Sequence, residues 1–131
     1  MQLTQESDYA VRIVYCLAKE GARRDARYIS EQMNVTLRFS LKILGKLAQG
    51  GLVRSYKGNR GGYELARPAA DISVKDVIDA VEGPYRISRC VGQDGCCNRG
   101  VSGSCEFQKV FARITGKVNE MLAAETFDKF I

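Results

Sequence analysis

The chain has 131 residues, 45% of them hydrophobic, and a formal net charge of +5. This length is enough for one compact domain or for a small domain with an arm, and the apolar content excludes wholesale disorder. No apolar run approaches the ~18 residues needed to span a bilayer, and the N-terminus lacks the features of a signal peptide. We therefore expect a cytoplasmic protein with no membrane partner.

The basic charge is concentrated in the first half of the chain. Residues 1–67 contain 12 Lys and Arg against 6 Asp and Glu, whereas residues 68–131 contain 8 against 9. The first half is therefore the candidate for binding a polyanion such as DNA. A basic face that is merely solvated would give the same charge pattern.

Three helical patterns open the chain. The first covers residues 7–20 and ends at Gly21, and the second covers residues 27–33. A third helix is expected from an N-cap at Thr36 to Gln49. A short helix, a tight turn and a longer helix form the helix-turn-helix pattern, in which the second of the two helices enters the DNA major groove. The side chains expected to face inward on that helix are Leu37, Leu41, Leu44, Leu47 and Ala48.

A glycine-rich hairpin follows directly. Residues 52–56 and 63–65 are expected to be strands, and residues 57–62 form the turn between them. A hairpin after a helix-turn-helix is a wing, whose tip cations can reach phosphates or a minor groove. This order on the basic half favours DNA binding over the use of winged helices in protein contacts. The predicted DNA-binding residues are Arg38, Ser40, Lys42 and Lys46 on the third helix and Lys57, Asn59 and Arg60 in the wing.

The third helix offers two kinds of contact. Arg38, Ser40 and Lys42 lie near its N-terminal end and are candidates for base edges or phosphates. Lys46 is expected to meet a phosphate.

The second half of the chain predicts two more helices. Ser73 resembles the first residue of a capping box and opens a helix that Gly83 stops. Residues 106–130 form a long helical pattern whose apolar residues have near-heptad spacing. The chain is too short to cover that stripe, so we expect a twofold homodimer, with packing against the chain's first helix as the alternative. The stripe consists of Phe107, Val110, Phe111, Ile114, Val118, Met121 and Leu122.

Between these helices lies a cysteine-rich loop. Four of the five cysteines fall between Cys90 and Cys105, together with four glycines. In a reducing compartment such a cluster indicates metal binding or redox work rather than disulfides. Thiolates hold iron–sulfur clusters and zinc, but the two-residue cysteine spacing of zinc knuckles is absent, and the chain contains no histidine. Cys16 is different, because it lies on an apolar helix and is expected to be a small core residue.

Two alternatives to a cluster remain. The loop could hold reduced thiols with no ligand, or Cys96, Cys97 or Cys105 could be oxidised in a metal-independent thiol sensor. An enzyme is not expected, because the chain has no Cys-x-x-Cys motif, no nucleotide-binding loop and no base among the cysteines. We therefore divide the chain into a winged helix-turn-helix domain (1–83), a cysteine-rich cluster-binding loop (84–105) and a dimerisation helix (106–131).

Several motifs resemble one family of regulators. They are the opening Ser7-Asp8-Tyr9-Ala10, the wing at residues 57–65, the helix at residues 72–83 and the three-cysteine loop. Together they resemble the IscR/NsrR-like bacterial iron–sulfur cluster regulators, which are dimeric winged-helix transcriptional repressors. The resemblance implies a double-stranded DNA operator, a homodimer and operator binding controlled by an iron–sulfur cluster, 2Fe–2S in preference to 4Fe–4S. It also implies regulation of iron–sulfur cluster biogenesis or of a related stress response.

The resemblance also assigns ligands. Cys90, Cys96 and Cys105 match the family's cluster cysteines, and Cys97 could replace Cys96. Asp8 matches an aspartate that ligates the partner's cluster in the nitric-oxide-sensing branch, although an acid in a first helical turn is also favoured by the helix dipole. Gln108 stands where the biogenesis branch has a histidine ligand. Leu41-Lys42 replaces acidic and amide side chains of that branch, so the same operator sequence is not expected.

Overall fold

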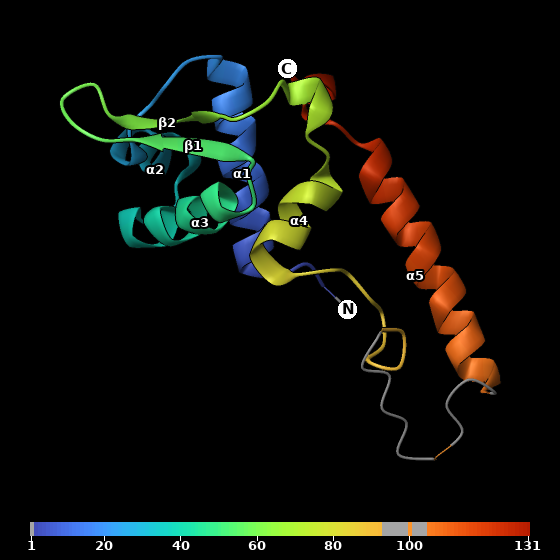
Figure 1. The fold of residues 1–131 in the computed structure, drawn as a ribbon. Helices are drawn as coiled ribbons and strands as arrows, with labels where there is room; N and C mark the ends of the chain where they lie inside the picture. Colours follow the sequence, from blue (N-terminus) through green and yellow to red (C-terminus); the bar gives the residue numbers. More distant parts are fainter. Residues whose placement is uncertain (1, 93–99, 101–104) are drawn as a thin grey trace.

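The computed structural model describes residues 2–92, 100 and 105–131. Its fold is a winged helix followed by one long helix (Figure 1). This confirms the predicted fold class, mainly helical with a small hairpin wing. The elements are α1 (Gln5–Glu20), α2 (Ala26–Met33), α3 (Leu37–Gln49), β1 (Val53–Tyr56), β2 (Gly62–Leu65), α4 (Val74–Glu82) and α5 (Glu106–Ala124), with short 3-10 turns η1 (Ala69–Asp71) and η2 (Phe127–Phe130).

Side-chain caps fix where the helices begin. Thr36 caps α3 as predicted, because its hydroxyl accepts a hydrogen bond of 3.2 Å from the backbone N–H of Phe39. Ser73 and Asp76 form the predicted capping box at the start of α4, with reciprocal side-chain to backbone bonds of 3.1 and 2.9 Å. Thr4 caps α1, so that helix begins two residues before its predicted start. Each such cap stabilises its helix by about 1 kcal/mol.

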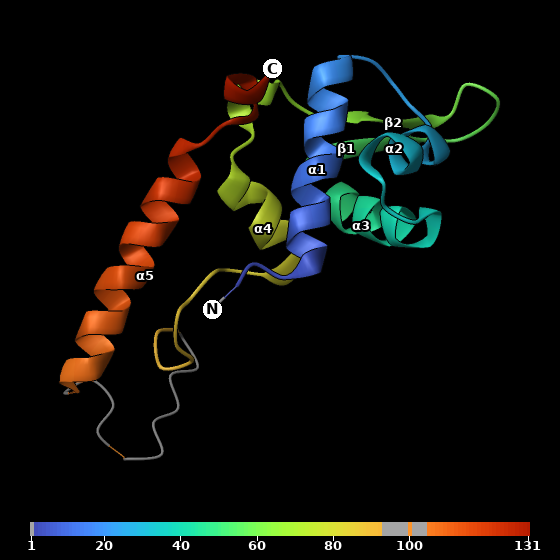
Figure 2. The same ribbon diagram turned by 180° about the vertical axis from the view of Figure 1, so that it is seen from behind.

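Helix α1 is the centre of the core. It has α2 and α3 on one side and α4 on the other (Figures 1 and 2). Each large aliphatic side chain buried there contributes about 1.5–3 kcal/mol. The fully buried apolar side chains of α1 are Ala10, Ile13, Val14 and Leu17.

The wing is an antiparallel hairpin held to the segment before α2. Strands β1 and β2 pair from Val53 opposite Leu65 to Tyr56 opposite Gly62. Arg24 adds a short third edge, because its backbone exchanges hydrogen bonds of 3.0 and 2.7 Å with Tyr63. A Cβ at position 62 would lie 2.6 Å from the Arg24 carbonyl oxygen, so this approach requires glycine.

The long C-terminal helix is shorter than predicted. It ends at Ala124, and residues 125–131 turn back to the winged-helix unit. The backbone N–H of Phe127 donates to Ile72 over 3.1 Å, and the Phe127 ring is fully buried. The prediction of a helix to residue 130 was wrong because this ring packs into the shared core, which a continued helix would not allow.

Helix α5 lies beside α4 and stands away from α2, α3 and the hairpin (Figures 1 and 2). Among the described side chains of α5, Thr115 is the buried one. The apolar stripe predicted on this helix is therefore largely uncovered, with Phe107 64% and Met121 70% exposed. None of the helices in the described ranges is long and apolar enough to cross a membrane.

Candidate DNA interface and cysteine site

Helix α3 turns most of its predicted face to the core, since Leu44 and Leu47 are buried and Leu37 and Ala48 pack partly buried against the core cluster. Its buried residues are Ser40, Ile43, Leu44 and Leu47, which lie three or four positions apart and so share one face. Ser40 is 0% exposed, so its predicted contact with DNA was wrong. Leu41 was expected to face inward and is instead 46% exposed. The predicted positions of Leu44 and Leu47 are therefore confirmed, and those of Ser40 and Leu41 were wrong.

The two cations near the start of α3, Arg38 and Lys42, lie on its outward face, as predicted. Arg38 is exposed, and the Lys42 side chain is 57% exposed. The Lys42 ammonium lies 3.9 Å from a Glu6 carboxylate oxygen and 5.8 Å from the centre of the Phe39 ring. These contacts leave Lys42 open to solvent, and its contact with DNA stays a prediction.

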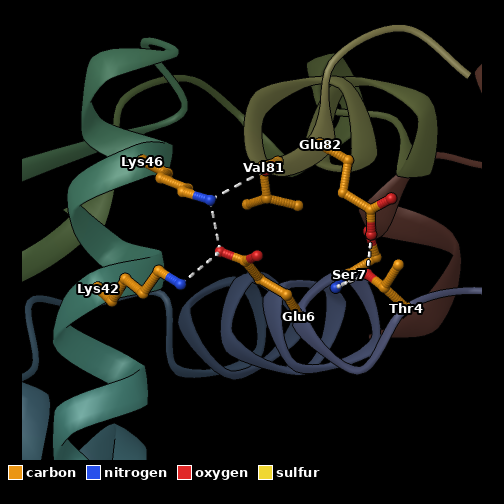
Figure 3. A network of polar contacts seen from close by, with 7 residues as sticks. All are labelled: Thr4, Glu6, Ser7, Lys42, Lys46, Val81 and Glu82. Carbon is orange, nitrogen blue, oxygen red and sulfur yellow. Dashed lines mark hydrogen bonds and ion pairs between the residues drawn. The ribbon is translucent and has the colours of Figure 1, made fainter.

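Lys46 has a structural role in addition to any contact with phosphate. Its ammonium lies 2.7 Å from the Glu6 carboxylate on α1 and donates to the Val81 carbonyl on α4 over 3.2 Å (Figure 3). Sequence reasoning placed it toward a phosphate, but the structure directs it between three helices. Lys46 therefore ties the recognition helix to α1 and α4.

A second contact joins α1 to the end of α4. The hydroxyls of Thr4 and Ser7 both donate to the Glu82 carboxylate (Figure 3). Ser7 is fully buried. The first turn of α1 is therefore bonded to α3 through Glu6 and to the last turn of α4 through Ser7.

The wing presents its predicted residues to solvent. Lys57, Asn59 and Arg60 are all exposed. Arg23, which sequence reasoning missed, supports them from beneath. Its guanidinium lies 3.4 Å from the centre of the Tyr56 ring and donates to the Arg60 carbonyl over 3.0 Å. A cation stacked on an aromatic ring holds the hairpin in place.

A polar cluster fixes the strand edge beside the wing. Glu20 accepts hydrogen bonds from the Tyr28 hydroxyl (2.5 Å) and the Arg24 guanidinium (3.0 Å). These two bonds, Tyr28 first, lower the pKa of Glu20 below its ordinary value, and the bond to Glu20 raises the pKa of Tyr28. The cluster keeps the end of α1, the start of α2 and the wing together.

The start of α3 and the tip of the wing project from the same side of the molecule, opposite α5 (Figures 1 and 2). This is the geometry with which a winged helix places one helix in a major groove and its wing on the adjacent backbone. Cations at both places suit the phosphates of a duplex. Arg38 and Lys42 on α3 and Lys57 and Arg60 in the wing are exposed.

Both described cysteines of the loop lie beside the first turn of α5. Cys105 is the N-cap residue of α5, and the Cys90 carbonyl accepts a hydrogen bond of 2.7 Å from Gln108 in its first turn. The Cys90 sulfur lies 3.1 Å from the Ser88 hydroxyl. Cys96 and Cys97 lie outside the described residues.

The chain leading to Cys90 runs along α5. The Thr115 hydroxyl accepts from the Ile87 N–H over 3.1 Å, and the Asn119 amide donates to the Tyr85 carbonyl over 3.2 Å. With the Gln108 bond these contacts follow one side of the helix from its middle to its start. They hold the segment that leads to Cys90 along α5.

Asp8, the other candidate ligand, has a partner on its own helix. Its carboxylate pairs with Arg12 over 2.7 Å and its side chain is about half exposed. Within residues 2–92, 100 and 105–131 no three Cys, Asp or Glu side chains gather into a metal site.

Cys16 is a core residue, as predicted. It is buried on α1, and burial raises the pKa of its thiol, with a further contribution from the Glu20 charge.

Comparisons with known proteins agree with this architecture. The model of the Rrf2 family, described as an iron-dependent transcriptional regulator, matches residues 3–131. The HTH-type transcriptional regulator IscR of Escherichia coli is 35% identical over 98 residues, which cover 73% of this chain and 60% of that protein. Two of the solved structures that match with a TM-score of 0.77 are regulators of known name. One is T. potens IscR (22% identity, 99% of this chain and 85% of that chain), and the other is CymR, the global cysteine regulator of B. subtilis (23% identity, 99% and 95%).

Proposed function

Since the chain belongs to the Rrf2 family of transcriptional regulators, we propose that it is a dimeric repressor whose operator binding is controlled by an iron–sulfur cluster. Family membership makes it a DNA-binding regulator of transcription. The cluster, the dimer and the regulated process, which we take to be iron–sulfur cluster biogenesis or a related stress response, are the proposed parts.

The placement of Cys90 and Cys105 beside the first turn of α5 is the observation that carries the proposal. Cys90 is held there through its backbone bond to Gln108, and Cys105 begins the helix. Helix N-termini favour negative charge, as on a thiolate-ligated cluster. Cys96, or Cys97 in its place, would supply the third thiolate.

The fourth ligand position has two candidates in the chain. Cys97 is one, and Asp8 of a second subunit is the other. Gln108 stands where the resembling family has a histidine ligand, and its amide nitrogen donates to the Cys90 carbonyl. We favour a 2Fe–2S cluster, which needs four ligands for its two irons. When bound, the cluster supplies a centre that responds to oxidants and to iron supply.

The dimer is proposed from the apolar stripe of α5. Phe107, Val110, Ile114 and Met121 are at least a third exposed in the single chain. An apolar row of this kind on one helix is suited to a twofold contact with its own copy. We propose that residues 106–131 form the dimer contact, with the correction that residues 125–131 also pack on the winged-helix unit.

Regulation would pass from the cysteine loop to the recognition helix through α4. The loop follows α4, whose last turn holds Lys46 of α3 through the Val81 carbonyl. A displacement at the end of α4 therefore acts on the orientation of α3. A tenfold change in operator affinity requires about 1.4 kcal/mol, which is the scale of one or two such contacts.

The test begins with protein isolated without oxygen. Visible absorption, an EPR signal after reduction, and matched iron and sulfide contents are expected from the wild type and from Cys16→Ala, and not from a Cys90→Ala, Cys105→Ala variant. Operator affinity should differ between the wild type and that double variant. A gel shift that weakens strongly between about 50 and 200 mM salt identifies binding through phosphates. The absence of iron and sulfide from the wild type overturns the cluster.

A metal-independent thiol sensor is the second candidate. It is favoured by the equally close fold of CymR, a regulator of cysteine. This function predicts colourless, iron-free protein whose operator binding is lost with peroxide and restored by a thiol reductant. Substituting Cys96, Cys97 or Cys105 singly should then abolish the response.

A further inference from the structure

The outward face of α3 carries an apolar strip as well as cations. Leu41 is 46% exposed, and Gly45 follows it one helical turn later on the same side. We call these two residues the α3 strip. The exposed cations Arg38 and Lys42 lie beside it on the helix. Because α5 is on the opposite side of the body, a second copy docked along α5 would leave the strip open (Figures 1 and 2).

Gly45 has no explanation in packing among the described residues. A Cβ added at this position would meet no atom of theirs within 4 Å. Glycine is among the poorest helix formers, and alanine in the same place would favour the helix. Glycine in an exposed helix is useful where another molecule must approach the backbone closely. Gly45 therefore points to a surface outside the chain.

We propose that the α3 strip reads thymine methyl groups in the major groove. The thymine C5 methyl projects into that groove, where apolar side chains recognise it by contact. Leu41 supplies the apolar contact, and Gly45 lets the base edge approach the helix. Arg38 and Lys42 commit the same surface to a polyanion, since they line one side of the strip with positive charge. The proposal rests on the proposed function, because it requires α3 to enter a major groove.

The test removes single methyl groups from DNA. A duplex is first selected from a random pool by the full-length protein. Each thymine is then replaced singly by deoxyuridine, which lacks only the methyl. At one or two positions this replacement should weaken DNA binding by the wild-type protein about fourfold, which corresponds to the loss of one buried methyl group. The same replacement should have no effect on Leu41→Ala. The proposed role of the α3 strip is overturned if every thymine can be replaced without loss of affinity, or if the Leu41→Ala variant loses as much affinity as the wild type.

Gly45→Ala provides the second arm. The added methyl group should raise the melting temperature of the protein, because alanine favours the helix and has open space. It should also weaken binding to the selected duplex by tenfold or more, since it fills the approach to the base edge. A variant that is more stable and binds as tightly as the wild type refutes the role of Gly45. If the wild type selects no duplex at all, the proposed function fails as well; if it selects one, only the strip is judged.

Discussion

Phe127 should be the most sensitive single position in the C-terminal segment. Its ring is 0% exposed and packs in the core cluster that contains Ile72, although it lies only four residues from the chain end. Phe127→Ala removes that ring and leaves a cavity, because the backbone around it is fixed by its bond to Ile72. The same change frees the end of α5 from the winged-helix unit.

The expected loss follows from burial. Truncation of a fully buried phenylalanine costs about 3–5 kcal/mol, whereas a domain of this size has a total unfolding free energy of about 5–15 kcal/mol. Phe127→Ala should therefore remove about a fifth or more of the stability. Urea unfolding followed by circular dichroism at one fixed protein concentration measures it, since dimerisation would make the midpoint concentration-dependent.

Phe130→Ala is the matched control. Its ring is 46% exposed and meets Phe127 edge to face at 5.7 Å between ring centres. Loss of such an aromatic pair costs about 0.5–1.5 kcal/mol. The reasoning is refuted if Phe130→Ala destabilises as much as Phe127→Ala, or if Phe127→Ala changes the unfolding free energy by less than about 1 kcal/mol.

Three other predictions separate residues that look alike in the sequence. Lys42→Ala should reduce the slope of log affinity against log salt by about one, with little loss of stability. Lys46→Ala should instead lower the unfolding free energy by about 1 kcal/mol, because its partners on α1 and α4 lose a bond. Equal salt slopes and equal stabilities of the two variants would contradict this. Glu20→Gln should lower the melting temperature at pH 7. The pKa of Glu20 is lowered in the folded protein, so its contribution to stability is present above the unfolded pKa and is lost as pH falls through the folded pKa. The difference in melting temperature between the variant and the wild type should therefore close in acid. A difference that widens in acid would contradict this reasoning. The cysteines of apo protein can be labelled with iodoacetamide and located by digestion and mass spectrometry. Cys90 should be labelled in the native state and Cys16 only after unfolding, because Cys16 is buried and the pKa of its thiol is raised. Equal labelling of the two in the native state would show that Cys16 is accessible.

Local signals in the sequence were sufficient for the order and limits of most elements. The caps at Thr36 and Ser73 depend on hydrogen bonds within four residues, so a short stretch of sequence determines them. The inward face of α3 could not be fixed in the same way. Leu44 and Leu47 follow the predicted pattern, but the choice between Ser40 and Leu41 depends on which face meets α1.

Contacts between distant segments account for the other differences. Lys46 appears in the sequence as an ordinary surface cation, because Glu6 and Val81 lie 40 and 35 positions away. Arg23 was missed for the same reason, since its ring partner Tyr56 is in the hairpin. Phe127 carried a usable signal, because an aromatic residue just after a Thr can end one helical run and begin a turn. The burial of the Phe127 ring still depends on the η1 segment, which packs against η2 and lies far from it in the sequence.

The first turn of α1 limits how strongly the cysteine loop can act on DNA binding within one chain. Glu6 holds Lys46 of α3, and Ser7 holds Glu82, which lies eight residues before Cys90. Each of these contacts contributes about 1 kcal/mol, up to about 3 kcal/mol where a charge takes part. Breaking one of them would therefore change operator affinity by about fivefold to 150-fold at most. A response of several thousandfold would require a second route, through a change in the spacing of two recognition helices at the α5 contact.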